Sequence, residues 1–292
     1  MPWIQIKIDV HAEQASQFED WLMEAGAEVV TLEDGADQPL FEPPLGTTPL
    51  WDQTRVVGLF DAGADSEAIL AWLAERAEPA TLLARAELLE DKDWEREWMK
   101  NFHPIQCGQR LWICPSWREP PDPAAVNLKL DPGLAFGTGT HPTTKLCLQW
   151  LDQQALEDRL VVDYGCGSGI LAIAALLLGA RQALAVDNDP QALTATRDNA
   201  LRNDVQDQVV TLLPDQVPDT QADIMVANIL AQPLIQLAPR LAALTRPGGL
   251  LALSGILREQ AEGVAERYRE WFDISAIEAQ EDWVRITGIR RS

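Results

Sequence analysis

A glycine-rich turn is the feature of this 292-residue sequence that most clearly predicts chemistry. An apolar strand pattern over residues 160–164 leads directly into Gly165, Gly167 and Gly169, and an apolar helical pattern begins at Ile170. Glycines in a strand–turn–helix unit allow unusual backbone angles and let a ligand approach the bare backbone, while the helix N-terminal amides favour a negative group. The third glycine comes one residue earlier than in GxGxxG turns, where a pyrophosphate lies in the turn. This glycine spacing therefore disfavours a dinucleotide as the ligand.

A carboxylate follows the next predicted strand. Asp187 comes directly after residues 183–186 and 22 residues after Gly165. At the tip of that strand, a carboxylate can accept hydrogen bonds from the two hydroxyls of a ribose. Asp189 precedes Pro190 and is better placed to cap the following helix, which leaves Asp187 for a ligand. The sequence predicts a ribose site at Asp187.

A third polar group ends another predicted strand. Asn228 is the last residue of the apolar run 224–228, and the carboxyl ends of parallel strands carry the site in open α/β sheets. Its side-chain carbonyl could accept a hydrogen bond from an amine, or the side chain could cap the following helix. We favour the amine, because a polar, uncharged group suits a site that must hold a neutral nitrogen.

The composition of segment 130–144 is unusual for a loop that only connects two elements. It contains three glycines, four threonines and Phe136 just before a predicted helix. Thr140 is the expected cap of that helix, with Pro142 near its first position. The remaining residues predict a lid over a ligand, in which Phe136 offers an apolar face and Thr144 a hydroxyl.

The elements before residue 93 predict a small α+β domain. Four strands are expected at residues 3–8, 28–32, 54–60 and 85–90, and helices at 12–25 and 66–78, with Ser66 as the cap of the second helix. Residues 33–52 are rich in proline and glycine and predict a loop. The order β-α-β-β-α-β is typical of a ferredoxin-like fold.

A short charged segment separates this domain from the rest. Trp94, Trp98 and Phe102 recur at helical spacing in residues 93–102, and His103-Pro104 ends the pattern. We therefore expect a ferredoxin-like domain at 1–92, a linker helix at 93–105 and a second domain at 106–292 that carries the glycine turn.

Strands and helices alternate through the third segment. Strands are expected at 110–115, 126–130, 160–164, 183–186, 209–213, 224–228, 250–254, 274–278 and 283–289, and helices at 143–156, 170–179, 190–203, 233–245 and 259–271. This alternation predicts an α/β fold with a Rossmann-like parallel sheet, helices on both faces and a terminal antiparallel hairpin.

Charge narrows the range of partners. Asp and Glu outnumber Lys and Arg by 45 to 23, and residues 1–100 carry 22 acidic against 7 basic side chains. Such an excess repels nucleic acid and anionic membranes and favours a basic protein. The four cysteines and three histidines show no metal-ligand or disulfide pattern, and no signal peptide or membrane span is apparent, so we expect a cytoplasmic protein without a metal.

Together these motifs resemble the class I S-adenosylmethionine-dependent methyltransferases. Asn228 is similar to the first residue of the Asn-Pro-Pro-aromatic motif of amino-group methylators, although Ile229 and Leu230 replace the prolines. The run 130–148, the DYGCGSGILAIAA turn and the NILAQPL strand end resemble the PrmA family more closely, and the acidic front domain and the tryptophan-bearing linker also fit. That family methylates the N-terminal α-amino group and lysine ε-amino groups of ribosomal protein L-eleven (L11) and uses its front domain to hold that protein. The resemblance therefore implies substrate recognition by residues 1–92 and S-adenosylmethionine binding by residues 106–292.

The resemblance also implies a set of site residues. Asn228 would position the reacting amine. Cofactor contacts would come from Thr144, Gly165, Asp187 and Asn228. The lid and the glycine turn would complete the pocket through Phe136, Gly137, Thr138, His141, Asp163 and Gly167.

Other functions remain to be weighed against this one. The nearest alternative is an amino-group methyltransferase that acts on another protein or on ribosomal RNA, and the acidic front domain argues against RNA. A nicotinamide-dependent oxidoreductase would need GxGxxG and a proton relay, yet none of the three histidines follows a strand tip beyond the glycine turn. A non-catalytic cofactor-binding protein would not need both the lid and Asn228.

Overall fold

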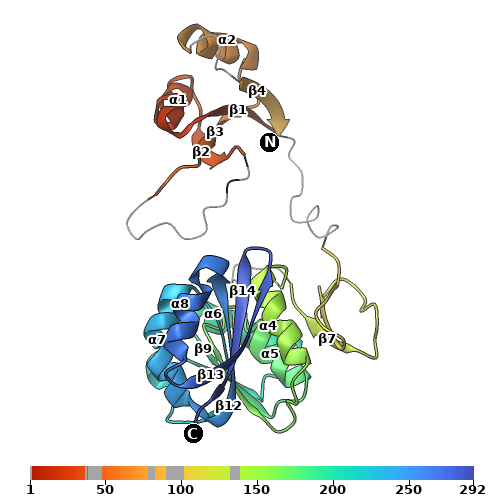
Figure 1. Ribbon diagram of the computed structural model, residues 1–292. Helices are drawn as coiled ribbons and strands as arrows, with labels where there is room; N and C mark the ends of the chain where they lie inside the picture. Colours follow the sequence, from red (N-terminus) through yellow and green to blue (C-terminus); the bar gives the residue numbers. More distant parts are fainter. Residues whose placement is uncertain (1, 37, 39–47, 78–82, 90–101, 132–138) are drawn as a thin grey trace. The chain divides into compact units, whose positions relative to one another are not determined.

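The computed structural model describes residues 2–36, 38, 48–77, 83–89, 102–131 and 139–292 (Figure 1). The chain divides into two compact units, Met1–Met99 and Lys100–Ser292.

The first unit is a four-stranded antiparallel sheet with two helices. Its strands are β1 (Trp3–His11), β2 (Val29–Asp34), β3 (Gln53–Asp61) and β4 (Leu83–Leu89), and its helices are α1 (Ala12–Glu24) and α2 (Ser66–Arg76). The strands lie in the order β2-β3-β1-β4, and every neighbouring pair is antiparallel. In chain order the elements run β1-α1-β2-β3-α2-β4.

Strand alternation builds the core of this unit. In β1 the side chains of Ile6, Ile8 and Val10 are buried, and they pack with Phe18 of α1 and Leu73 of α2 in one cluster. Both helices therefore cover the same face of the sheet, as expected for strands with one apolar side.

The second unit is a seven-stranded sheet with helices on both faces. Its strands are β8 (Leu160–Tyr164), β9 (Gln182–Val186), β10 (Val209–Leu212), β11 (Ala222–Asn228), β12 (Thr245–Leu257), β13 (Phe272–Gln280) and β14 (Trp283–Arg290). They lie in the order β10-β9-β8-β11-β12-β14-β13. The strands β8 to β12 pair in parallel, and β14 pairs antiparallel with both β12 and β13. The predicted parallel sheet and terminal antiparallel hairpin are confirmed.

Two apolar layers hold the helices to this sheet. The helices of the second unit are α4 (Pro142–Asp152), α5 (Ile170–Leu177), α6 (Pro190–Arg202), α7 (Ala231–Leu244) and α8 (Ala261–Tyr268). The first three contribute to one buried cluster, and α7 and α8 contribute to the other. Figure 1 shows α7 and α8 on one side of the sheet and α4 and α5 on the opposite side.

The strand order reverses at the centre of the sheet. From β8 the chain adds β9 and β10 on one side, then crosses to add β11 and β12 on the other. A crevice forms at such a reversal, at the carboxyl ends of the strands, and this is where open α/β sheets bind ligands.

A smaller sheet precedes the central one in the chain. It consists of β5 (Ile105–Gln106), β6 (Leu111–Cys114) and β7 (Val126–Lys129), with β5 antiparallel and β7 parallel to β6. The expected linker helix over 93–105 lies largely outside the described residues. Its end differs from the prediction, because residues 102–104 have no regular structure and Ile105 pairs with Ile113.

Several element ends also differ from the prediction. Asp65, not Ser66, caps α2, because its carboxylate accepts the Ala68 N–H while Ser66 is already helical. The strand expected to end at Ser254 continues to Leu257, because its far end pairs with β14. The helix expected at 259–271 is shorter, and residues 258–260 form a 3-10 turn before it.

Among the described residues, no helix is both long enough and apolar enough to cross a membrane.

Candidate active site

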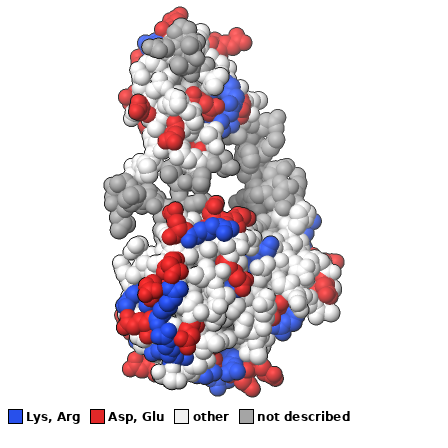
Figure 2. All heavy atoms as spheres, in the orientation of Figure 1, with Lys and Arg blue, Asp and Glu red and all other residues white. Residues whose placement is uncertain are grey.

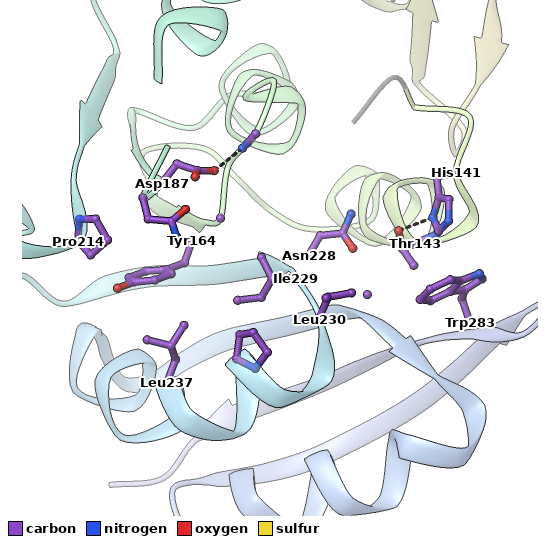
Figure 3. Close-up of a pocket in the computed structure, with 15 residues that line it drawn as sticks. His141, Thr143, Tyr164, Asp187, Pro214, Asn228, Ile229, Leu230, Leu237 and Trp283 are labelled. Carbon is purple, nitrogen blue, oxygen red and sulfur yellow. Dashed lines mark hydrogen bonds between the residues drawn. The ribbon is translucent and has the colours of Figure 1, made fainter. Parts of the chain in front are cut away.

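A cavity of about 620 Å³ opens at the carboxyl ends of the central strands (Figure 3). It is formed by residues that follow β8, β9, β10 and β11, by the start of α4 and by the terminal hairpin. The lining residues are His141, Thr143, Tyr164, Gly165, Gly167, Asp187, Asn188, Pro214, Asn228, Ile229, Leu230, Pro233, Leu237, Gly255 and Trp283.

The glycine turn forms the floor of this cavity. Gly165, Gly167 and Gly169 have φ values of 82°, 53° and 76°, in the left-handed region that favours glycine. A Cβ on Gly165 would collide with the side chain of Ile229, so the turn must also be bare to pack there. The N–H of Gly165 donates to the Val186 carbonyl at 2.7 Å, which ties the turn to β9.

Asp187 lies where the sequence predicts it, at the end of β9. Its Oδ2 accepts the Gly167 N–H at 2.9 Å, and its Oδ1 accepts the Asp189 N–H at 3.0 Å. The predicted capping role of Asp189 is confirmed, because its carboxylate accepts the Gln191 N–H at the start of α6. Asp187 therefore supports the turn and also faces the cavity.

Asn228 lies between the two ends of the cavity in Figure 3. Its Nδ2 donates to Thr144 Oγ1 at 3.2 Å, whereas its buried Oδ1 has no hydrogen-bond partner among the residues that the structure describes. The alternative in which Asn228 caps the following helix is wrong, because Leu230 occupies that position. An orphaned buried oxygen is costly unless a ligand donates to it. Asn228 Oδ1 could thus accept a hydrogen bond from an N–H or O–H group of a ligand.

The two adjacent threonines of α4 have different places. Both side chains are buried, but only Thr143 is among the residues that line the cavity. The Thr144 hydroxyl accepts a hydrogen bond from Asn228, and the prediction that it also contacts the cofactor stays a prediction. Consecutive helical positions point about 100° apart, so only the packing of α4 decides which threonine faces a ligand.

His141 lines the cavity and caps α4. Its Nδ1 accepts the Thr143 N–H at 3.4 Å and lies 2.7 Å from Thr143 Oγ1, so the expected cap, Thr140, is wrong. The imidazole packs edge-on against Trp283, with ring centroids 4.9 Å apart. Burial lowers the pKa of His141, and the nearby Glu281 carboxylate opposes this only in part.

Asp163 lies beneath the turn rather than in the cavity wall. Its side chain is almost fully buried, and Oδ2 accepts the Ala172 N–H at 3.1 Å. Oδ1 has no hydrogen-bond partner in the described part of the chain. Burial raises the pKa of Asp163 to about 7, and the Asp187 carboxylate adds to this effect.

Three predicted residues, Phe136, Gly137 and Thr138, lie outside the described residues. Sequence reasoning missed most of the apolar wall, which is formed by Tyr164, Pro214, Ile229, Leu230, Pro233, Leu237 and Trp283. Trp283 could not be foreseen, because it is brought to the cavity by the pairing of β14 with β12. Ile229, Leu230 and Pro233 could have been predicted, because they directly follow Asn228, which the sequence already places at a strand tip in the site.

The composition of the lining limits the ligand. Carboxylate, amide, hydroxyl and imidazole groups face an otherwise apolar wall, and none of the described lining residues is Lys or Arg. The cavity can hold an organic ligand whose hydroxyl and N–H groups donate hydrogen bonds to Asp187 and Asn228.

Comparison with known proteins identifies the family to which the chain is similar. A model of the family described as "Ribosomal protein L11 methyltransferase (PrmA)" matches residues 2–291. A protein named ribosomal protein L11 methyltransferase from Marinobacter nauticus is 60% identical and covers 100% of this chain and 99% of its own. Its namesake from Cellvibrio japonicus is 58% identical and covers 99% of each chain.

A solved structure agrees with this match. The crystal structure of a ribosomal protein L11 methylase from Lactobacillus delbrueckii subsp. bulgaricus is 32% identical, with a TM-score of 0.60. The similarity covers 65% of this chain and 100% of that one. The family match spans nearly every residue, and the relatives are aligned along their whole length. The chain therefore belongs to the PrmA family of ribosomal protein L11 methyltransferases.

Proposed function

We propose that this protein transfers methyl groups from S-adenosylmethionine to the N-terminal α-amino group and lysine ε-amino groups of ribosomal protein L11. The observation that carries the proposal is the buried, unpartnered Oδ1 of Asn228 in the cavity of a chain that matches the family over its whole length. The oxygen is suited to accept an N–H from an amine.

The cavity has the groups that such a cofactor needs. Asp187 would accept the ribose hydroxyls, and the turn at Gly165 and Gly167 would admit the cofactor against bare backbone. Asn228 and His141 line the same cavity, whereas Thr144 and Asp163 would act from behind it. The proposed contacts of Phe136, Gly137 and Thr138 come from the resemblance alone.

When bound, S-adenosylmethionine supplies an electrophilic methyl carbon, whose S–C bond breaks with the electron pair left on sulfur as the amine nitrogen forms the N–C bond. The protein has to align the nitrogen lone pair with that carbon, and such positioning supplies roughly 7–11 kcal/mol of a barrier. Because the amine must be neutral, deprotonation costs about 1 kcal/mol at pH 7 for an α-amino group and roughly 4–5 kcal/mol for lysine.

Asn228 suits this task because it is polar and uncharged. A carboxylate in its place would raise the pKa of the amine and keep it protonated. His141 is a poor base, since its Nδ1 already accepts the Thr143 N–H and burial lowers its pKa. We therefore assign the lining residues to positioning, and the proton leaves to solvent.

The first unit would hold the protein substrate. Its strand order and its β-α-β-β-α-β chain order support a ferredoxin-like fold within the predicted boundary of residues 1–92. Each Lys and Arg that the structure describes in this unit, Lys7, Arg55, Arg76 and Arg85, is ion-paired with an acidic residue. The net charge that the first unit presents to a partner is therefore negative.

The surface supports this assignment. Figure 2 shows acidic side chains over the visible face of the first unit with few basic ones, whereas both signs are interleaved on the second. Such a surface attracts a basic ribosomal protein and disfavours direct contact with nucleic acid. A ribosomal protein substrate also implies action in the cytoplasm.

The test is to incubate the full-length protein with labelled S-adenosylmethionine and purified L11, and to identify the labelled residues by mass spectrometry. We expect label at the N-terminal amine and at lysines. A parallel incubation with ribosomal extract compares L11 with other proteins and with RNA. Label that appears in RNA or in another protein but not in L11 would contradict the proposal.

A further inference from the structure

Ile229, the residue that follows Asn228, lies between two glycines of the neighbouring strands. Its strand, β11, has β8 on one side and β12 on the other. A Cβ on Gly165, which follows β8, would collide with Cγ2 of Ile229. A Cβ on Gly255 of β12 would lie 2.7 Å from the carbonyl carbon of Ile229 and 3.0 Å from its nitrogen. Ile229 therefore occupies a glycine slot, formed by Gly165 and Gly255, that no residue with a side chain could form.

A β-bulge forms one wall of this slot. Between Leu253 and Ile256, two residues of β12 lie opposite the single residue Arg285 of β14. Gly255 is one of these two residues, and its φ of 82° is in the left-handed region that favours glycine. Bulges bend a strand and are frequent beside active sites. The bend at Gly255 lies where the backbone of β12 packs on Ile229.

The sequence after Asn228 explains why such a slot is needed. In the Asn-Pro-Pro-aromatic motif that Asn228 resembles, prolines follow the asparagine, and a proline ring fixes the backbone angle φ. Ile229 and Leu230 have no such ring, so their own chemistry does not fix the backbone there. The glycine slot restrains the same backbone through tertiary contacts.

We infer that Ile229 is a positioning residue: held between Gly165 and Gly255, it fixes the end of β11 and so places the Asn228 side chain relative to the glycine turn. The inference rests on the proposed function, because it takes methyl transfer to an amine as the reaction that Asn228 serves. Ile229 also lines the cavity, so the competing explanation is that only its apolar surface matters.

The slot connects the two halves of the proposed reaction. Gly165 belongs to the turn that would admit the cofactor, and Asn228 would hold the amine. The contact on the Gly165 side is made by Cγ2, which branches from Cβ, and a β-branched side chain has few χ1 rotamers. The contact is therefore closely coupled to the backbone beside Asn228. A misplacement of about 1 Å can lower a rate about a hundred-fold.

The experiment separates the branch of the Ile229 side chain from its volume. Ile229→Leu keeps the volume but removes the branch at Cβ, whereas Ile229→Val keeps the branch and loses one carbon. Initial rates of the full-length enzyme on L11 at saturating donor give kcat, and calorimetry gives the Kd of S-adenosylhomocysteine. Ile224→Leu is the matched control, because Ile224 is a buried residue near the start of β11 and is not among those that line the cavity.

We expect Ile229→Leu to lower kcat about ten- to a hundred-fold, and to lower it more than Ile229→Val does. The Kd of S-adenosylhomocysteine should change far less than kcat, since the glycine turn itself keeps its sequence. Ile224→Leu should lower the melting temperature and leave kcat unchanged, because it disturbs the same strand far from the slot.

A second pair of variants tests the slot from the side of β12. Gly255→Ala places a methyl group against the backbone of Ile229 and should also lower kcat. Gly248→Ala is its control: Gly248 lies in the same strand with a φ of 73°, but its Cβ would meet only Arg246 Nη1, at 3.6 Å. Both changes should lower the melting temperature, because alanine is strained at these angles, and only Gly255→Ala should lower kcat.

Three results would overturn the inference. A larger loss of kcat in Ile229→Val than in Ile229→Leu, or no loss in either, would show that the branch does not matter. A fall in Ile224→Leu or Gly248→Ala as large as in the slot variants would show a general structural effect. A rise in Kd that matches the fall in kcat would place Ile229 against the cofactor instead.

Failure of the proposed function gives a different result. A wild-type protein that transfers no methyl to L11 would contradict the proposed function, and this inference with it. A wild-type protein that methylates L11, with Ile229→Leu and Gly255→Ala as fast as wild type, would contradict this inference alone.

Discussion

The carboxylate of Asp187 accepts the backbone N–H of Gly167 across 2.9 Å, so the residue expected to hold a ribose also fixes the glycine turn beneath it. Its second oxygen accepts the Asp189 N–H. Each carboxylate oxygen still has acceptor capacity left, because an ionised carboxylate has about four lone-pair sites. If Asp187 holds the ribose as proposed, cofactor affinity and turn geometry are coupled through this one side chain.

Asp187→Ala should weaken S-adenosylhomocysteine binding at least ten-fold, because the ribose hydroxyls and the Gly167 amide lose an acceptor worth about 1.5–3 kcal/mol for a charged group. Calorimetry measures the affinity directly. Asp189→Ala is the matched control: it removes the α6 cap and should cost about 1 kcal/mol of stability with unchanged affinity. Equal affinity of the Asp187→Ala and wild-type proteins would remove Asp187 from the site.

Because the pKa of Asp163 is raised in the folded protein, we expect the stability of the protein to depend on pH. Burial raises its pKa to about 7 in the folded protein, against 3.8 as the ordinary value, so between these values the folded state binds more protons than the unfolded one. Its contribution to stability is present at acid pH and is lost as pH rises toward 7. Asp163→Asn should remove that loss and raise the unfolding temperature of the ligand-free protein above pH 7.

Asp223 is a control for Asp163, because its pKa is shifted in the opposite direction. Burial would raise the pKa of Asp223, but hydrogen bonds from the Leu160 N–H, Arg246 and Arg159 lower it overall. Asp223→Asn should therefore destabilise the protein at neutral pH, and the difference from wild type should fade as pH falls below 4. If both variants showed the same pH trend, the assignment for Asp163 would be wrong.

The sequence predicted the parts of the site that depend on local pattern. The strand at 160–164 was predicted with the bounds it has, because an apolar run followed by glycines leaves little freedom. The Asp189 cap was predicted from its place before Pro190. Asp187 and Asn228 were placed at strand tips, where sheet topology brings residues far apart in sequence to one edge.

Features that depend on packing could not be predicted in this way. Whether Thr143 or Thr144 faces the cavity depends on the rotation of α4 against the sheet. Trp283 reaches the cavity only because β14 pairs with β12 in a particular register. Gly255 looked like an ordinary strand glycine, yet its lack of a side chain allows the close approach of Ile229. These relationships are set by tertiary contacts that no local window contains.

Trp283 lies beside His141, away from Asp187 in Figure 3, and so should influence the amine substrate more than the ribose. Its ring can pack on the alkyl chain of lysine and attract the cation, an interaction of about 0.5–2 kcal/mol. Trp283→Leu should raise the KM for L11 several-fold with little change in S-adenosylhomocysteine affinity. Trp271→Leu, in the cluster around α7 and α8, should change stability but not KM. A loss of cofactor affinity alone would place Trp283 against the cofactor instead.

Removal of residues 1–92 should separate cofactor binding from substrate docking. The described residues that line the cavity all belong to the second unit, so S-adenosylhomocysteine affinity should be retained. Methylation of L11 should be abolished, because the acidic surface that attracts it is gone. Circular dichroism and a melting curve establish that the truncated chain is folded. A folded truncation with full activity on L11 would refute the docking role of the first unit.

Asn228→Asp tests why the pocket holds an amide and not a carboxylate. The Thr144 hydroxyl can donate to the new carboxylate, so the hydrogen bond between the two side chains can persist. The negative charge, however, would favour the ammonium form of the substrate and raise its pKa, which lowers the neutral fraction ten-fold for each unit. We expect the variant to be slower than wild type at pH 7 and to gain on it as pH rises, in rates measured across pH at saturating donor. A loss of rate that is the same at every pH would mean that Asn228 does not face the reacting nitrogen.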